Sequence, residues 1–476
     1  MICLRYLRIL EGGNLADACQ TFTVKSSDIT ERLDVGFYNP KYFETIDKMR
    51  NLTKNPKLKL DKIEMLFDNG EDLKITGGAT PLGATYLEEG IQFIRVQNVR
   101  RNEFLLNDVK YIPKFIHDSM LKRSQLKECD VLLTITGTYG YSVVVPDNLG
   151  DANMNQHLVR MRFDREKISP KYISYFLNSK LGRIQTDRWV TGSSRPALDY
   201  EAIKQIYILY PTGREAQNEI VDKVDSLIAE AKHHKEKYNG LISTLDDIYL
   251  SEINIKLPKN ENMAFTTHSI DGRIDAKYNS PFLKGLRQLI KASPNKELKK
   301  LLKLADPQPI TFASDYKLIE LEDIDEAMGE VSNIETVLDL GSSKVVLKKG
   351  QIVVSKLQPE SAKIFIVDKK ADKCLGSGEL EPLEVISDEA LPEYLWCILR
   401  SPYVLKQWEY ATTGSTRERI GESELYETLI PLPDKSKQKE IVDKVSDVIK
   451  KAKEERQQYK ENIILAEKTF IDYITS

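Results

Sequence analysis

Cysteine is scarce in this sequence, which has five cysteines among 476 residues and no Cys-x-x-Cys pair. Few, scattered and odd-numbered cysteines argue against a disulfide framework or a zinc site, and they are typical of a reducing compartment. The five histidines also lack the spacing to carboxylates or thiols that holds a metal ion. We therefore expect a cytoplasmic protein with free thiols and no bound metal.

Long apolar segments are absent as well. No run of about 18 apolar residues occurs, so no membrane span is expected. The first residues place Arg5, Arg8 and Glu11 around a short apolar run and lack the apolar core of a signal peptide. The net charge of −3 excludes a general affinity for polyanions but permits local basic patches.

The sequence also lacks complete motifs for ATP binding and for DNA methylation. No G-x-x-x-x-G-K-[ST] loop is present to bind ATP. Residues 39–42 (NPKY) and 279–282 (NSPF) approach the N-P-P-[YF] loop of amino-methyltransferases, which holds a flipped base beside an aromatic ring. Lys41 and Ser280 stand where that loop requires proline, and no glycine-rich cofactor turn follows a strand nearby. We expect no catalytic residues and no cofactor.

One segment, in contrast, occurs twice. The pattern that begins at Gln217 and reaches Tyr238 recurs between Gln438 and Tyr459, with matched residues 221 positions apart. Such self-similarity indicates a duplicated structural unit. At 476 residues, the chain is long enough for two to three domains.

Apolar residues in each copy follow steps of four and three, a period of 3.5 that favours a helix pairing with another helix. One face of an ordinary bundle helix is the alternative. Because the chain between the copies must return, we predict an antiparallel coiled coil. The predicted seam consists of Ile220, Val224, Leu227, Ala231, Tyr238, Leu241, Leu245, Ile248, Ile441, Val445, Val448, Ala452 and Tyr459, continuing after a change of register to Ile463, Ala466 and Phe470.

The rest of each half repeats too. Residues 32–34 (RLD) and 38–39 (YN) recur at 273–275 (RID) and 278–279, and residues 191–195 (TGSSR) recur at 413–417 (TGSTR). Short β-rich runs separated by glycine turns fill the segments between. We predict an α+β protein with an internal twofold repeat: lead-in 1–59, first module 60–213, central helix 214–255, linker and second lead-in 256–296, second module 297–434 and C-terminal helix 435–476.

Several segments together resemble a known family. They are residues 76–81 (TGGATP), 90–99 (GIQFIRVQNV), 130–140 (DVLLTITGTYG), 155–156 (NQ) and 191–195, followed by the entry into the long helix. In this order, and repeated, they resemble the specificity subunit of type I restriction–modification systems. The second half departs from the pattern, since it lacks a G-G-x-T-P segment and places residues 355–357 (SKL) where the glycine-rich turn stood.

The resemblance implies a bacterial or archaeal protein with two target-recognition domains separated by an antiparallel coiled coil. Each domain would read one half of a split, double-stranded DNA target, while the helices set the gap. Two methyltransferase subunits and the restriction subunits would be the partners and would carry the chemistry, so this chain would be non-catalytic.

DNA contact requires cations and small polar groups on projecting loops. A solvated surface role is the alternative for each such residue. The candidates are Arg95, Asn98, Arg100, Arg101, Thr136, Thr138, Tyr139, Ser193, Ser194 and Arg195 in the first module, and Lys356, Ser415, Thr416, Arg417 and Arg419 in the second.

A different class of function also fits the helices. A coiled-coil assembly or tethering protein would use the same seam without reading DNA. Selection of a sequence from a random DNA pool would distinguish the two hypotheses.

Overall fold

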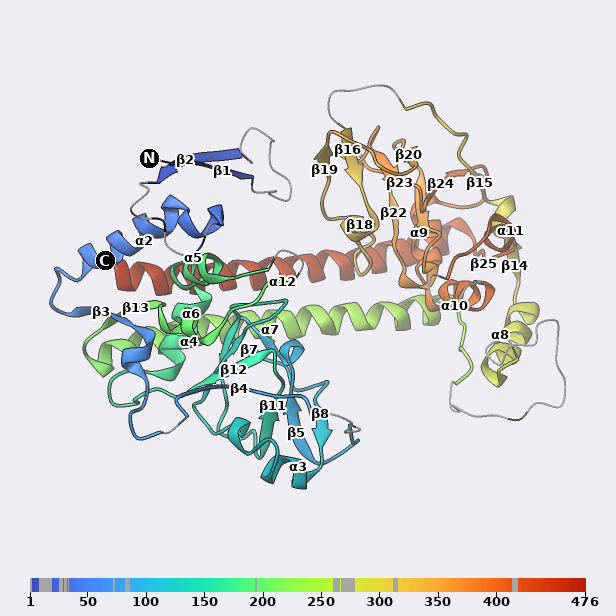
Figure 1. Cartoon of the computed structure of the whole chain (residues 1–476). Coiled ribbons are helices and arrows are strands. Elements are labelled where there is room, and N and C mark those ends of the chain that lie inside the picture. The colour runs from blue at the N-terminus through green and yellow to red at the C-terminus, as the bar shows by residue number, and fades with distance from the viewer. Residues whose placement is uncertain are drawn as a thin grey trace. The chain divides into compact units, whose positions relative to one another are not determined.

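The computed structural model describes residues 2–7, 19–24, 29, 32, 34–71, 73–81, 86–192, 195–259, 266, 279–310, 316–412 and 418–476. The chain divides into two compact units, one of residues 1–232 with 459–476 and the other of residues 233–458 (Figure 1). Each unit therefore contains one predicted module and one end of both predicted helices. Within the described residues, no helix is long and apolar enough to cross a membrane.

The two predicted helices are present as α7 (Arg214–Glu252) and α12 (Lys435–Thr475), each without a break (Figure 1). They run antiparallel in the second unit, where the carboxylate of Glu252, near the end of α7, meets Lys437 at the start of α12. In the first unit, Glu219 near the start of α7 accepts a hydrogen bond from Tyr473 near the end of α12. The predicted antiparallel pairing is confirmed.

Burial along the seam follows the predicted period only in part. Ile220, Ala231, Val445 and Ala452 are at most 2% exposed, whereas Ile463 is 41% exposed and lines a pocket together with Val224 and Ile228 of α7. Other buried positions lie outside the predicted seam, including Val221, Tyr249 and Ile449. The physical reason is that each helix packs against its module as well as against the other helix, which widens the buried face.

The first unit contains two principal sheets. One has the order β10 (Ser142–Val144), β9 (Val131–Thr134), β12 (Leu158–Met161) and β4 (Ile75–Gly77). The other places β5 (Ile91–Ile94) between β11 (Ala152–Met154), which it pairs in parallel, and β8 (Lys110–Ile112). A third pair, β3 (Leu58–Lys62) with β13 (Tyr207–Pro211), closes the unit next to the start of α7.

Shorter elements complete the first unit. They are β1 (Ile2–Leu7), β2 (Cys19–Val24), α2 (Pro40–Leu52), β6 (Val99–Arg100), β7 (Glu103–Phe104), α3 (Lys114–Asp118), α4 (Pro170–Asn178), α5 (Lys180–Trp189) and α6 (Tyr200–Lys204). Helix α4 begins at a proline, which suits the first helical position, and ends before Ser179.

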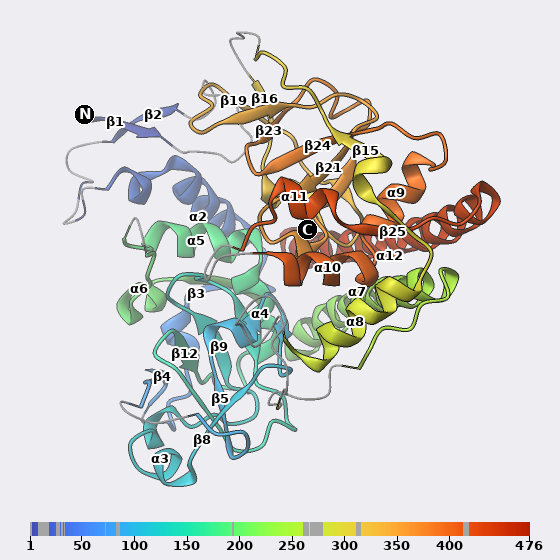
Figure 2. The same ribbon diagram turned by 90° about the vertical axis from the view of Figure 1, so that its right-hand side faces the viewer.

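The second unit repeats this plan. One sheet has the order β15 (Leu302–Leu304), β24 (Leu380–Val385), β21 (Ile352–Ser355) and β22 (Ile364–Ile366). The other has the order β19 (Glu335–Val337), β16 (Tyr316–Ile319), β23 (Leu375–Ser377) and β20 (Lys344–Val346). The first three of these strands are labelled in Figure 2. The parallel pairing of β16 with β23 matches that of β5 with β11.

Shorter elements of the second unit correspond as well. They are α8 (Pro281–Ala292), β14 (Asn295–Glu297), β17 (Ile324–Asp325), β18 (Glu330–Val331), α9 (Pro392–Leu399), α10 (Pro402–Ala411), α11 (Glu422–Tyr426) and β25 (Leu429–Pro431). Residues 273–275 and 278 of the predicted second lead-in lie outside the described residues.

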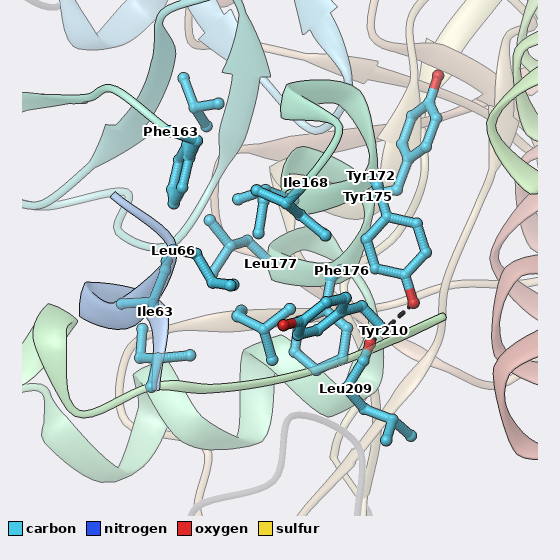
Figure 3. Close-up of a cluster of buried hydrophobic side chains, with 14 of the residues drawn as sticks. Ile63, Leu66, Phe163, Ile168, Tyr172, Tyr175, Phe176, Leu177, Leu209 and Tyr210 are labelled. Atoms are coloured by element: carbon cyan, nitrogen blue, oxygen red, sulfur yellow. Dashed lines mark hydrogen bonds between the residues drawn. The ribbon is translucent and has the colours of Figure 1, made fainter. Parts of the chain in front are cut away.

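A buried cluster connects each module to its helices. In the first unit, Tyr172 lies among Leu66, Phe176 and Leu209, and its hydroxyl donates to the Leu209 carbonyl at 2.8 Å (Figure 3). Tyr394 donates to the Pro431 carbonyl at 2.6 Å in the same way. The internal repeat therefore extends to individual hydrogen bonds in the core.

Candidate nucleic-acid interface

Three loops meet at one end of the first unit's four-stranded sheet. They are the loop that follows β9, the turn between β11 and β12, and the described residues 191–192 and 195–198. The Ile135 amide donates to the His157 carbonyl at 3.0 Å, and the Leu198 amide donates to the Ile135 carbonyl at 2.9 Å. Thr136 forms an isolated β-bridge with Ala197. The loops are thus fixed to one another through their backbones.

The predicted residues of these loops are brought together. Thr138 and Arg195 are exposed, while Thr136 and Tyr139 are half-buried. Gly137, between the threonines, has φ +72°, a conformation that glycine adopts without steric cost. Ser193 and Ser194 lie outside the described residues. The described members present threonine hydroxyls and a guanidinium on one loop surface, groups that contact phosphates and base edges. The Tyr139 hydroxyl donates to Asp187 Oδ1 at 3.0 Å.

Arg183 of α5 is a residue that the sequence interpretation missed. Its Nη1 donates to the Tyr139 carbonyl at 2.6 Å, and its guanidinium carbon lies 5.1 Å from the Tyr139 ring centroid and 5.6 Å from that of Tyr141. A Cβ atom on Gly140 would approach Arg183 Nη1 to 2.0 Å. Arg183 therefore fixes the loop after β9, and only the tertiary fold brings it there.

The basic run between residues 95 and 101 is divided by the fold. Asn98 is 1% exposed, and its amide is occupied by the Arg95 amide and the Leu105 carbonyl, both at 2.9 Å. Arg95 Nη2 donates to the Asp108 carboxylate at 3.2 Å. These two side chains hold the turn in shape, which leaves the Asn98 amide without a group to offer to a base.

The other two arginines of this run are exposed. Arg100 Nη1 donates to the neighbouring Val99 carbonyl, and the Arg101 guanidinium lies 5.4 Å from the Tyr141 ring centroid. Arg183 lies near the same Tyr141 ring, so this ring contacts both guanidinium groups. Arg101 thus extends the basic surface, whereas Arg95 and Asn98 support it from within.

The predicted cations of the second module are held by carboxylates. Arg419 makes two bonds to Glu379, Nε to Oε2 at 3.0 Å and Nη2 to Oε1 at 2.6 Å. Lys356 Nζ lies 3.1 Å from a Glu381 carboxylate oxygen. Ser415, Thr416 and Arg417 lie outside the described residues.

Two further residues border the loops of the first module and were not predicted. Gln156 accepts a hydrogen bond from Thr80, and His157 Nε2 lies 3.2 Å from Arg195 Nη2. Partial burial, with a smaller contribution from the Arg195 charge, lowers the pKa of His157 below its ordinary value. The imidazole is therefore neutral near pH 7, and Nε2 accepts a hydrogen bond from the guanidinium. The sequence signal that pointed to this turn was the segment 155–156, one of those that resemble the known family.

A charge cluster anchors the opposite end of the same strands. Asp130, directly before β9, receives a hydrogen bond from Arg162 Nε at 2.8 Å, and Arg162 Nη1 donates to Glu71 at 2.7 Å. Asp130 is 2% exposed, so the pair joins β9 to the segment after β12 through a buried, charge-assisted contact. The strand that leads into the loop surface is thereby held at its start.

Among the residues that the structure describes, no three His, Cys, Asp or Glu side chains gather to hold a metal ion. Cys129, Cys374 and Cys397 are free thiols. The surface offers donors and acceptors suited to binding a polyanion with exposed base edges.

The chain is similar in sequence to known proteins. A model of the type I restriction modification DNA specificity domain matches residues 65–243 and 309–463. The type I restriction enzyme EcoBI specificity subunit of Escherichia coli is 28% identical over 166 residues, which cover 34% of this chain and 34% of that protein. The match thus spans about a third of that curated relative.

The fold is also similar to that of solved structures. The type I restriction-modification S subunit from M. genitalium superposes with a TM-score of 0.46 and 10% identity, over 87% of this chain and 96% of that one. The HsdS subunit from Thermoanaerobacter tengcongensis gives a TM-score of 0.34 and 13% identity, over 88% and 97%.

Proposed function

The chain belongs to the type I restriction modification DNA specificity family, and on that premise we propose that it is the subunit that reads a bipartite DNA target for a type I restriction–modification complex. Each unit would bind one half of the target. The observation that carries the proposal is the duplicated module in which equivalent loops, at the same end of equivalent sheets, carry arginine side chains among their described residues.

The chemistry of these loops supports DNA as the ligand. Arg195, Arg101 and Thr138 lie on described surfaces of the first unit, where guanidinium and hydroxyl groups can donate to phosphate oxygens or guanine edges. The overall charge of −3 supplies no general attraction, so binding would depend on this local surface. Selective recognition, rather than coating of any polyanion, is the expected behaviour.

The same proposal includes the partners and the division of labour. Methyltransferase subunits and restriction subunits would assemble on this chain, and the catalytic and cofactor sites would lie in them. A cytoplasmic location in a bacterium or archaeon belongs to the same proposal, because such a complex acts on DNA there.

A selection experiment tests the proposal. The full-length chain, co-expressed with its methyltransferase partner, is mixed with a random duplex pool, and bound DNA is sequenced through several rounds. We expect enrichment of one asymmetric target with two specified parts and an unspecified gap. Binding to the methyltransferase without any enriched sequence would instead support the coiled-coil tethering alternative.

A further inference from the structure

The turn between β11 and β12 has a structural equivalent in the second unit, the turn between β23 and β24. The Ile135 amide donates to the His157 carbonyl at 3.0 Å, and the Lys356 amide, 221 positions later, donates to the Glu379 carbonyl at 2.8 Å. His157 and Glu379 therefore occupy the same place in the two modules, although no sequence motif aligns them.

The neighbouring segment is equivalent by the same test. Leu198 donates its amide to the Ile135 carbonyl at 2.9 Å, and Ile420 donates to the Lys356 carbonyl at 3.0 Å. In both units the adjoining loop supplies an arginine that contacts the residue of the turn: Arg195 contacts His157, and Arg419 contacts Glu379. The two arginines do not occupy equivalent positions, because the offset that relates Leu198 to Ile420 relates Arg419 to Ala197, but each contacts the residue of the turn.

The first module holds its arginine with a neutral partner. Arg195 Nη2 donates to His157 Nε2 at 3.2 Å. In the described part of the chain, no carboxylate lies within ion-pair distance of Arg195, so its positive charge is not compensated locally. A cation of this kind can neutralise a DNA phosphate and release a counterion.

The second module holds its arginine with an acid. Two charge-assisted bonds join Arg419 to Glu379 in the fork geometry that guanidinium and carboxylate share, and the Arg419 side chain remains 47% exposed. As a pair the two groups are neutral. The second unit presents guanidinium donors beside carboxylate acceptors, and this combination suits the edge of a base pair. It suits a phosphate less well, because the carboxylate repels the phosphate charge.

From these contacts we propose that Arg195, which contacts His157 and no described carboxylate, is a phosphate-binding cation of the first module, whereas Glu379 holds Arg419 of the second module in a charge-neutral pair that contacts base edges. The inference rests on the proposed DNA-reading function and deepens it. It assigns different roles to the two arginines that contact the equivalent turn residues His157 and Glu379.

The salt dependence of binding distinguishes the two roles. Each lost phosphate contact reduces the slope of log Kd against log salt by about 0.9. For the full-length chain with its methyltransferase partner on the selected target, Arg195→Ala should reduce the slope by about this amount and weaken all sequences alike. Arg419→Ala should leave the slope nearly unchanged and alter base preference in one half-site.

Substitution of the turn residues tests the cause. His157→Glu should compensate Arg195 and reduce the slope as Arg195→Ala does, and the two changes together should give no further reduction. Glu379→Gln should expose the charge of Arg419 and increase the slope by about 0.9. Glu379 is 30% exposed, so this variant perturbs the fold least and keeps the test usable if His157→Glu fails to fold.

Arg165→Ala is the matched control. Arg165 is 62% exposed in the same unit and follows β12 at the end opposite to the loops, so its removal should not change the slope. Equal slope changes for Arg195→Ala and Arg419→Ala, or none for either, would overturn the inference. If no DNA sequence is enriched at all, the proposed function itself fails, which is a different outcome.

Discussion

At the scale of single residues, two buried glutamines connect the modules to the long helices. Gln217, at the start of α7, donates to the Pro211 carbonyl at 2.9 Å and accepts from the Ser169 amide at 2.9 Å. Gln438, at the start of α12, donates to the Pro433 carbonyl and accepts from the Leu391 amide, both at 2.8 Å. The glutamine that opens each repeat copy is therefore a structural anchor.

Replacement of this anchor has a predictable cost. Gln217→Ala leaves buried backbone groups unsatisfied, so it should reduce the free energy of unfolding by about 1–3 kcal/mol. Urea denaturation of the full chain measures the effect. The exposed neighbour Asn218→Ala is the control and should stay within about 0.5 kcal/mol of the natural protein. An equal effect for both changes would contradict the anchoring role.

At the scale of the elements, the two helices combine an apolar seam with ionic contacts along its edge. Glu252 of α7 lies 2.7 Å from Lys437 Nζ and 2.8 Å from Lys444 Nζ of α12. His234 also contacts Glu455 across the pair. Because the contacts pair high residue numbers on one helix with low numbers on the other, they fit only the antiparallel register.

The Glu252 contact predicts a dependence of stability on pH. Hydrogen bonds from Lys437 and then Lys444 lower the pKa of Glu252 below its usual 4.5. A carboxylate with a lowered folded-state pKa stabilises the fold at pH values above its unfolded-state pKa, and this contribution disappears as the pH falls through the folded-state value. Glu252→Gln should therefore lower Tm at pH 7 by a small amount, corresponding to less than about 1 kcal/mol, and the difference should shrink as the pH falls below the usual 4.5 of a glutamate.

Thermal unfolding of both proteins between pH 3 and pH 7 measures this. The exposed Asp222→Asn on the same helix serves as the control, and its difference from the natural protein should not narrow in the same way. A Glu252→Gln difference that grows on acidification would have the wrong sign for this explanation.

At the scale of the whole molecule, both long helices pass without interruption from one compact unit to the other. The boundary between the units falls between residues 232 and 233 in α7 and between 458 and 459 in α12. If each unit reads half of a target, the number of helical residues at this boundary sets the gap in the DNA that is left unread.

An insertion tests this directly. Four residues added to both helices at the boundary lengthen each by about 6 Å. Since a base-pair step is about 3.4 Å, the selected half-sites should stay the same while the gap grows by one or two base pairs. The inserted turn also rotates the helix faces, so some loss of affinity is expected. Sequencing of methylated sites in a host carrying the variant gives the answer.

The control for the insertion substitutes alanine at four exposed positions of α7 without changing its length, and its gap should be unchanged. New half-site bases with the old gap would show that the helices do not set the spacing.

The last prediction concerns cofactor binding, which the proposed function assigns to the methyltransferase partner and not to this chain. Calorimetry of the isolated chain with S-adenosylmethionine should show no heat of binding, because cofactor sites belong to the proposed methyltransferase partner. The assembled complex is the positive control. Micromolar binding by the isolated chain would contradict the scaffold role.

The sequence by itself determined the long helices and the duplication. Apolar period and fixed offset are local properties of the chain, and they predicted α7, α12 and their antiparallel pairing correctly. The loop after β9 was also found from its glycines, because a backbone with positive φ favours that residue type.

Tertiary structure alone decided which polar side chains meet. His157 and Arg195 are 38 positions apart, and sheet pairing brings them into contact. The corresponding strand pairing in the second unit brings Arg419 to its carboxylate partner Glu379. In the first unit, packing buries Asn98 although its neighbours Arg100 and Arg101 are exposed. Composition and spacing do not encode such contacts, because burial and partners depend on residues distant in the chain.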